Sequence, residues 1–229
     1  MMPILGVPIV ERIMENLDIK GIAQFIVVVS PHDNDIVQYF REESRFHSRV
    51  RLITQPQALG TVDALKYASP LIDGDFLLSS CDNLVESNEI SRMLDHWNGL
   101  SDPKGLLAVM PMEAREVKRS SLVEMAEEEV ISIVEKPLGE DLRSGIASLP
   151  LYIFSPLILC YLNEVQPSIR GEREIQDAVQ ILIDRRGRVG IFSISERMTL
   201  TSPPDLLAIN MNYLKLSNSF TFESALQCG

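Results

Sequence analysis

Apolar runs and amphipathic segments alternate along the first part of the chain. Residues 25–29 read FIVVV, an unbroken and mostly β-branched run that predicts a strand covered on both faces, as in a parallel sheet. Apolar residues recur at helical spacing before and after this run. We predict strands at residues 25–29, 50–54 and 76–80, and helices at about 9–17, 33–40 and 61–68. Such an alternation of helices and strands is typical of a doubly wound sheet.

The second half of the chain is less regular and contains a predicted hairpin. The acidic turn at residues 127–129 joins two short apolar segments, as expected for a pair of antiparallel strands. We predict strands at residues 106–110, 122–126, 130–134, 151–154 and 189–194, a helix at 175–182, and a last helix lined by Leu207, Met211 and Leu214. The whole pattern predicts an α/β fold, with a Rossmann-like, mixed and mostly parallel sheet and helices on both faces. We expect one domain over residues 1–216 and a polar, loosely held tail at 217–229.

The order of elements departs from that pattern at its start. An open α/β sheet normally begins with a strand, and the loop after this strand binds phosphate. Only Met1–Val7 precede the first predicted helix in this sequence. We therefore expect a fold that is truncated at its N-terminus and lacks its first strand. The apolar sheet edge left exposed would favour self-association, so a homo-oligomer is also predicted.

Charge and cysteine content narrow the classes of partner. The 229 residues include 21 Lys and Arg against 32 Asp and Glu, a formal net charge of −11. This excess of acid argues against a nucleic-acid partner, because phosphate backbones are bound by clustered cations. The three cysteines show no CxxC spacing, which fits a reducing compartment. No apolar run reaches membrane-spanning length and the N-terminus lacks a basic segment, so we predict a cytoplasmic protein with no membrane partner.

Two polar segments follow predicted strands and could bind a nucleotide. Asp82 comes directly after the strand at 76–80, and carboxylates at the carboxyl ends of parallel strands can hold Mg²⁺ against phosphate oxygens. In the loop after the strand at 50–54, the Gln55 amide suits the edge of a base, Gly60 permits close backbone approach, and Thr61 can cap the next helix. The alternatives are that Asp82 only opens a turn and that the loop is an ordinary connection.

A third polar segment, Glu135-Lys136-Pro137, ends the predicted hairpin. Pro137 is expected to hold Lys136 in an extended conformation and to stop the strand. The carboxylate could accept hydrogen bonds from sugar hydroxyls and the lysine could offset a phosphate, or the two could form an exposed ion pair of little energetic value. Two DxD triplets, at 33–35 and 73–75, raise the alternative of a metal-dependent glycosyltransferase, but their positions at a helix start and a strand entrance favour structural roles.

Seven segments follow one another from Pro3 to about Leu216. They read PILGVPIVERIMENL, QPQALGTVDAL, FLLSSCDNLV, ISIVEKP, SLPLYIFSP, GEREIQDAVQILI and TSPPDLLAIN. In this order they resemble the nucleoside-diphosphate-sugar pyrophosphorylases, which are the sugar-phosphate nucleotidyltransferases. The resemblance implies the nucleotide-diphospho-sugar transferase fold and the reaction of a nucleoside triphosphate with a sugar 1-phosphate, which yields a nucleoside-diphosphate sugar and pyrophosphate.

The resemblance also implies roles for particular residues. The nucleotide would be bound by Gln55, Gly60 and Thr61, and Mg²⁺ by Asp82. The sugar phosphate would be bound by Glu135, Lys136 and Ser148, with Asp82 and Lys136 acting in catalysis. Such a site aligns two anions and neutralises their charge rather than forming a covalent intermediate.

Three departures from the family pattern concern catalysis. The sequence contains no loop of the form G-G-x-G-T-R, which cradles the triphosphate in the family, and Cys81 replaces the glycine before the metal-binding aspartate. Thr199 stands where the family has a second metal-binding aspartate. We therefore expect impaired activity in this chain, and the alternative function is that of a non-catalytic ligand-binding or regulatory subunit on the same scaffold.

Overall fold

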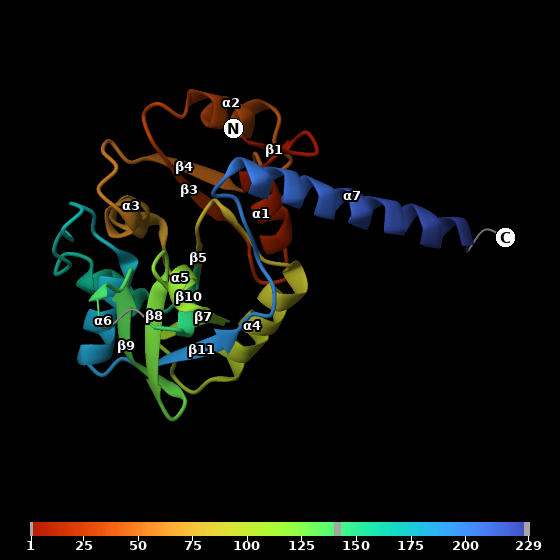
Figure 1. Cartoon of the computed structure of the whole chain (residues 1–229). Helices are drawn as coiled ribbons and strands as arrows, with labels where there is room; N and C mark the ends of the chain where they lie inside the picture. Colours follow the sequence, from red (N-terminus) through yellow and green to blue (C-terminus); the bar gives the residue numbers. More distant parts are fainter. Residues whose placement is uncertain (1, 140–142, 227–229) are drawn as a thin grey trace.

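The computed structural model describes residues 2–139 and 143–226, with side chains described as far as residue 215 outside that gap. Its largest sheet has six strands, in the order β11-β7-β10-β8-β9, with β5 paired to the other part of β10 (Figure 1). These strands are β5 (Phe76–Ser79), β7 (Gly105–Met112), β8 (Ser121–Ala126), β9 (Glu129–Glu135), β10 (Gly145–Phe154) and β11 (Val189–Ser193). All the strands predicted in the second half therefore join one sheet.

The strands of the first half form a separate, parallel pair. β3 (Phe25–Val29) pairs with β4 (Val50–Thr54), and α2 (Asn34–Glu42) connects them. Two smaller antiparallel pairs complete the described sheets: β1 (Pro3–Ile4) with β2 (Val7–Pro8), and β6 (Asn83–Leu84) with β12 (Met198–Thr199). The expectation of one sheet through the whole domain is therefore wrong, because no described strand joins β3 to β5.

Helices cover both faces of the six-stranded sheet, as predicted. On one face, α1 (Ile9–Leu17) and α4 (Ser87–Gly99) share a hydrophobic cluster with Leu106 and Ala108 of β7. On the other, α3 (Thr61–Ala68) and α6 (Ile175–Asp184) share a second cluster with Leu107 and Val109 of the same strand. Successive side chains of a strand point to opposite faces, so the unbroken apolar run of β7 is buried on both sides. The mixed α/β class is confirmed.

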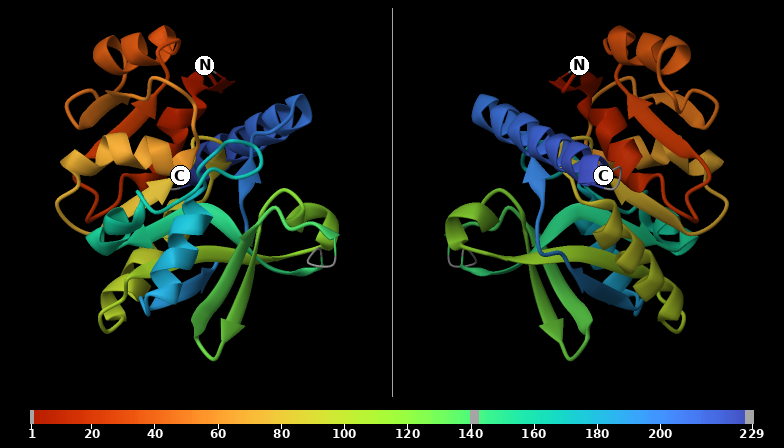
Figure 2. Two further views of the ribbon diagram at one scale, coloured as in Figure 1. Left: turned by 90° about the vertical axis from the view of Figure 1, so that its left-hand side faces the viewer. Right: turned by 90° about the vertical axis from the view of Figure 1, so that its right-hand side faces the viewer.

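The sheet is less parallel than predicted. Among the described pairs only β3–β4 and β7–β11 run parallel. β10 runs antiparallel to β5, β7 and β8, and β8–β9 is a hairpin (Figure 2). Because β10 lies in the middle of the sheet and runs opposite to its three neighbours, most strand pairs of the sheet are antiparallel.

The remaining helical segments are short, apart from the last. They are α5 (Ala114–Val117), the 3₁₀ segments Ser69–Leu71 and Pro156–Tyr161, and α7 (Pro203–Leu226). α7 extends away from the body of the molecule and continues through the predicted boundary at residue 216 (Figure 1). The boundary stays a prediction, and residues 227–229 of the predicted tail lie outside the described residues.

The prediction of which residues form the apolar face of the last helix is wrong. Leu207, Met211 and Leu214 of α7 are all exposed, whereas Ile209 is buried in the core. No helix in the described part of the chain combines the length and the apolar character needed to span a membrane.

Candidate functional site

Asp82 lies just beyond the carboxyl end of β5 and is held by its neighbours. Ser80 Oγ donates a hydrogen bond to Asp82 Oδ1 at 2.6 Å, and Asn83 Nδ2 donates to the same oxygen at 2.9 Å. The backbone N–H of Ser80 donates to the Pro150 carbonyl at 3.0 Å, which ties this segment to β10. The half-buried carboxylate is thus fixed in orientation, with one oxygen engaged by two donors.

A cation lies beside this carboxylate. Arg197 Nη1 donates to Asn83 Oδ1 at 2.8 Å, and Thr199 Oγ1 donates to the same oxygen at 3.2 Å. Burial lowers the pKa of the Arg197 guanidinium, and the charges of Asp82 and Glu116 act in the opposite direction. An arginine remains protonated in either case, so it supplies positive charge next to Asp82.

Asp82 could contribute one carboxylate to a magnesium site. Thr199 pairs with Asn83 across β6 and β12, so the position expected to carry a second metal ligand is next to Asp82 but bears a hydroxyl. The described residues contain no group of three or more His, Cys, Asp or Glu side chains that could hold a metal ion. Mg²⁺ commonly takes one or two carboxylates and completes its shell with water and substrate phosphates. Asp82 fits a site of that kind.

A row of polar residues crosses three neighbouring strands. Ser148 of β10 lies opposite Ser121 of β8, and Ser121 lies opposite Glu135 of β9. Ser121 Oγ donates to Glu135 Oε2, and Lys136 Nζ lies 3.3 Å from Glu135 Oε1. β5 runs antiparallel to β10 and ends with Ser79 opposite Leu151, and the N–H of Ser80 donates to the Pro150 carbonyl, so the chain that leads to Asp82 runs toward the end of β10 that carries Ser148. The row Ser148–Ser121–Glu135 and Asp82 therefore lie at the same end of the sheet.

The backbone at Lys136 differs from the prediction. β9 ends at Glu135, so Pro137 does follow the end of the strand, but Lys136 has a φ of 47° and is not extended. This left-handed conformation is uncommon for a residue other than glycine. The N–H of Lys136 donates to the Ser120 carbonyl at 2.8 Å, which continues the hairpin by one bond while the chain turns.

Tyr152 is a buried residue of β10 that interacts with members of both groups of residues. Its hydroxyl accepts a hydrogen bond from Gln176 Nε2 at 3.1 Å, and its side chain is buried. Burial raises the pKa of Tyr152 above its ordinary value; a hydrogen bond to Ser148 lowers it and the charge of Glu135 raises it. Arg197 in turn interacts electrostatically with both Asp82 and Tyr152. Tyr152 therefore interacts with Ser148 and Glu135 on one side and with Arg197 on the other.

The loop predicted to bind a nucleotide packs against the start of α6. Gln55 Nε2 donates to Asp63 Oδ2 at 2.9 Å and to the Gly60 carbonyl at 3.3 Å. Gly60 has a φ of 101°, and a Cβ on it would lie 2.5 Å from the backbone N and O of Arg173. The close backbone approach expected at Gly60 therefore involves Arg173.

The prediction that the Thr61 side chain caps its own helix is wrong. Thr61 is the first residue of α3 and makes no cap to its own helix. Its Oγ1 accepts a hydrogen bond at 2.9 Å from the N–H of Ile175, the first residue of α6. The hydroxyl satisfies one of the free amides at the start of a different helix, because the two loops are held together by Val62, Arg173 and Leu59 backbone bonds.

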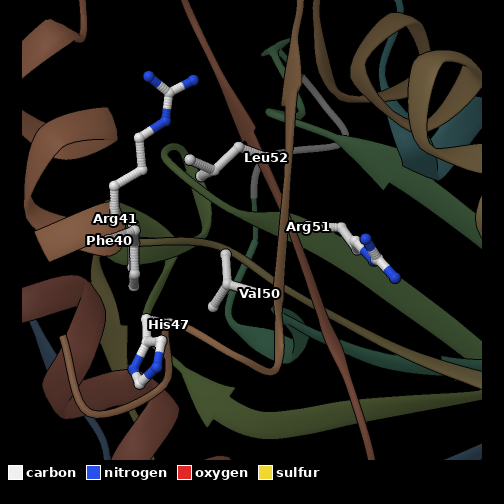
Figure 3. Close-up of a pocket in the computed structure, with 6 residues that line it drawn as sticks. All are labelled: Phe40, Arg41, His47, Val50, Arg51 and Leu52. Atoms are coloured by element: carbon white, nitrogen blue, oxygen red, sulfur yellow. The ribbon is translucent and has the colours of Figure 1, made fainter.

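Other polar features lie away from this edge of the sheet. A cavity of about 400 Å³ at the outer edge of β4 is lined by Arg41, His47 and Arg51, but Figure 3 shows the two arginine side chains extending in different directions. They do not converge on one anion. The triplet at 33–35 lies at the start of α2, and the triplet at 73–75 precedes β5 at the end opposite Asp82.

Sequence reasoning missed Ser121 and Arg197. Ser121 precedes an apolar run without any motif, and only the strand register brings it to Glu135. Arg197 lies two residues before Thr199, on a segment that reaches Asn83 through a pairing of two-residue strands. A cation two residues from a position expected to bind metal is the one signal that could have identified it.

Comparisons with known proteins show the family of this chain. A family model described as nucleotidyl transferase matches residues 1–213. The chain belongs to the nucleotidyl transferase family. It is 29% identical over 220 residues to the bifunctional protein GlmU of Methanococcus vannielii, covering 94% of this chain and 50% of the relative. It is 28% identical over 186 residues to the glucose-1-phosphate thymidylyltransferase of Streptomyces griseus, covering 80% of this chain and 51% of that protein.

Solved structures show the same fold at lower identity. A UDP-glucose pyrophosphorylase complexed with UDP-glucose superposes with a TM-score of 0.76 at 21% identity, over 94% of this chain and 89% of that one. The UTP-bound enzyme from Acinetobacter baumannii gives 0.74 at 20% identity, over 92% and 83%. This member of the nucleotidyl transferase family therefore has the expected nucleotide-diphospho-sugar transferase fold. It spans about half the length of the curated relatives it matches.

Replacing Ser121 by alanine is expected to destabilise the protein through Glu135. The substitution removes the buried donor to a mostly buried carboxylate, and a hydrogen bond to a charged group contributes about 1.5–3 kcal/mol. Urea denaturation should show a loss in the lower part of that range. Ser193→Ala, at an exposed position in β11, is the matched control and should change stability by less than about 0.5 kcal/mol. Equal effects of the two substitutions would contradict the assigned bond.

Proposed function

We propose that this site binds a nucleoside triphosphate and a sugar 1-phosphate and transfers the nucleotidyl group between them. The observation that carries the proposal is that the row Ser148–Ser121–Glu135 lies at the same end of the sheet as Asp82, which follows the carboxyl end of β5. Carboxylates, a lysine and Arg197 at one sheet edge are suited to aligning two phosphorylated substrates. Membership of the nucleotidyl transferase family and the printed activity of the Streptomyces relative support it.

In the proposed reaction an oxygen of the sugar phosphate attacks the α-phosphorus of the triphosphate. A new P–O bond forms, the bond to the β-phosphate oxygen breaks, and pyrophosphate leaves with the bonding electron pair. Asp82 would hold Mg²⁺, which when bound neutralises phosphate charge. Arg197 adds positive charge on the same side, and its hydrogen bond to Asn83 fixes its position. Ser80 and Asn83 orient the Asp82 carboxylate.

The sugar phosphate is assigned to the other end of the row. Glu135 would accept hydrogen bonds from sugar hydroxyls, Lys136 would neutralise the phosphate, and Ser148 would lie beneath the sugar. The ion pair of 3.3 Å and the bond from Ser121 hold the Glu135 carboxylate in place before substrate arrives. Such preorganisation lowers the cost of ordering the site on binding.

The nucleotide is assigned to the loop of Gln55, Gly60 and Thr61. The Gln55 amide nitrogen is used within the loop, which leaves its carbonyl oxygen as the acceptor for a base donor. We also place the protein in the cytoplasm, because Cys81 and Cys160 are free thiols.

Binding and turnover test this proposal separately. Isothermal titration calorimetry with a panel of nucleoside-diphosphate glucoses, with and without Mg²⁺, should identify at least one ligand whose binding requires the metal. Failure of every nucleotide sugar to bind would overturn the assignment. Pyrophosphate release from a panel of triphosphates and hexose 1-phosphates then measures the transfer step. Binding without any release would contradict the transfer step and favour a ligand-binding subunit.

Lys136→Met is expected to weaken binding of the sugar phosphate about tenfold, in keeping with the loss of one charge-assisted hydrogen bond of about 1.5 kcal/mol. Methionine keeps most of the length of the side chain. The control is Lys20→Met, which removes the same charge at an exposed position beyond α1. Titration of glucose 1-phosphate alone, without triphosphate, gives the two dissociation constants. An unchanged constant for Lys136→Met would contradict its role.

A further inference from the structure

The cavity of about 400 Å³ at the outer edge of β4 combines an apolar part with a cationic part. Its apolar part is formed by Phe40 of α2 and by Val50 and Leu52 of β4, which all belong to or pack against one hydrophobic cluster. Its polar part is formed by Arg41, His47 and Arg51. Both kinds of side chain therefore accompany one strand along its outer edge.

The outer edge of β4 has backbone groups without a strand partner. The N–H of Gln55 donates to the Val29 carbonyl at 2.8 Å, and in a parallel ladder alternate residues of a strand bond to the same neighbour. The odd-numbered residues of β4 therefore bond to β3. The N–H and C=O groups of Val50, Leu52 and Thr54 point outward, where no described strand pairs with β4.

The two arginines of the cavity lie on opposite sides of β4. Val50 and Leu52 point toward the hydrophobic cluster, so Arg51, which alternates with them, points to the other face of the strand. Figure 3 shows Arg41 extending on the side of Val50 and Leu52, and Arg51 on the opposite side. The two guanidinium groups therefore cannot bind one small anion together, but both can be reached by a chain that lies along the strand.

These arginines also lack acidic partners of their own. Arg41 and Arg51 are both exposed, and neither forms an ion pair with a residue of the part of the chain that the structure describes. The whole chain has a formal net charge of −11, so acidic side chains are abundant elsewhere. The edge of β4 is thus a local cationic strip on an acidic protein, and such a strip attracts an acidic partner.

We propose that the outer edge of β4 binds an extended acidic segment of a separate protein, which adds to the β3–β4 pair as a further strand. The segment hydrogen-bonds to the outward backbone groups of β4, as strands do when they add to a sheet edge. Its side chains alternate between the two faces. An acidic residue opposite Arg51 forms an ion pair on one face, and apolar residues opposite Val50 and Leu52 enter the cavity on the other, where a further acidic residue reaches Arg41.

Charge disfavours a second copy of this chain as the occupant. A charged side chain on an edge strand normally prevents pairing with another chain. Pairing of β4 with β4 of a second copy would bring the arginines of the two copies together, and like charges on paired strands are destabilising. The outer edge of β9 is partly occupied, because the N–H of Ile133 donates to Gln180 Oε1 at 2.9 Å. The same cations that exclude a second β4 attract an acidic strand.

Hydrogen exchange with a synthetic peptide tests the proposal. The probe is the blocked peptide Glu-Thr-Val-Glu-Val-Thr-Glu, whose sequence is the same in both directions, so that its central glutamate meets Arg51 in a parallel or an antiparallel pairing. At about 10 times its dissociation constant, the amides of Val50, Leu52 and Thr54 should exchange about tenfold more slowly. The amides of Ile26 and Val28, on the other edge of the pair, are the control and should be unchanged.

Two peptide variants separate the contributions of charge and backbone. The peptide Lys-Thr-Val-Lys-Val-Thr-Lys keeps the apolar residues but reverses the charge, and it should not protect these amides. A peptide with N-methyl groups on its two valines and central glutamate keeps every side chain but loses N–H donors, and it should not protect them either.

A charge exchange on the protein identifies the contact with Arg51. Arg51→Glu should weaken binding of the acidic peptide about tenfold, because one exposed attraction is replaced by a repulsion of similar size. The peptide Glu-Thr-Val-Lys-Val-Thr-Glu should then bind this variant more tightly than it binds the unsubstituted protein. Arg186→Glu, at an exposed position in the turn before β11, makes the same change of charge and should leave the affinity of both peptides unchanged.

Several results would overturn the proposal. These are equal binding of the charge-reversed or the N-methylated peptide, no protection by the acidic peptide, and equal protection of Ile26 and Val28. Failure of the central lysine to improve binding to Arg51→Glu would contradict the contact with Arg51. Protection that appears without peptide and grows with protein concentration would identify a second copy as the occupant instead. No nucleotide is present in the experiment, so its outcome is independent of the proposed function.

Discussion

Asp82→Asn is expected to weaken Mg²⁺-dependent nucleotide binding by about 100-fold, since changing groups that only orient a metal ligand already costs about 10- to 100-fold. The asparagine retains an oxygen that can accept the bonds from Ser80 and Asn83, so the local structure should survive. What is lost is the negative charge that a divalent cation requires. Calorimetric titration of the tightest-binding triphosphate, with and without Mg²⁺, measures the effect.

The matched control for this prediction is Asp73→Asn. It removes one carboxylate from an exposed position before the other end of β5. Its affinity for the nucleotide should equal that of the unsubstituted protein, and both variants should unfold at similar urea concentrations. If Asp82→Asn bound the nucleotide with unchanged metal dependence, the metal assignment would be wrong.

Gly60→Ala is expected to lower the free energy of unfolding by about 3 kcal/mol, since a positive φ and an overpacked contact each contribute about 1–3 kcal/mol. The added Cβ would lie 2.5 Å from the backbone N and O of Arg173, and the φ of Gly60 is 101°. Neither backbone can move freely, because Arg173 bonds to Leu59 and Val62. Urea denaturation measures the loss, and nucleotide affinity should fall with it.

Gly74→Ala is the matched control for the substitution at Gly60. A Cβ at Gly74 would meet no atom within 4 Å, so the change in stability should stay within about 0.5 kcal/mol. A Gly60→Ala variant as stable as Gly74→Ala would show that the loop at 55–61 and the start of α6 do not pack as described.

Strand positions could be predicted from the sequence because they depend on local pattern. β3 and β4 occur at the predicted residues, and β9 and β10 contain the predicted runs. Which strands pair with one another depends on distant parts of the chain, so the local pattern does not predict it. β10 is a neighbour of β5, β7 and β8, and its direction makes most of the ladders antiparallel.

The contact between Ser121 and Glu135 could not be predicted, because it depends on a β-bulge in β9. Met125 pairs with Val130, but Glu124 pairs with Ser132, so Ile131 is an extra residue in β9. Without this bulge Ser121 would face Val134, and the side chain of Glu135 would belong to a different row. One inserted residue therefore decides that Glu135 meets Ser121.

The central claim is that Asp82 and the Glu135–Lys136 couplet serve one site. Paramagnetic relaxation by Mn²⁺, used in place of Mg²⁺ with a bound nucleotide sugar, measures this most directly. The account predicts that the signals of Asp82, Ser148, Ser121 and Lys136 broaden together, and that Asp82→Asn abolishes the effect at all of them. Broadening confined to the exposed acidic turn at 127–129, or persisting in Asp82→Asn, would contradict the account.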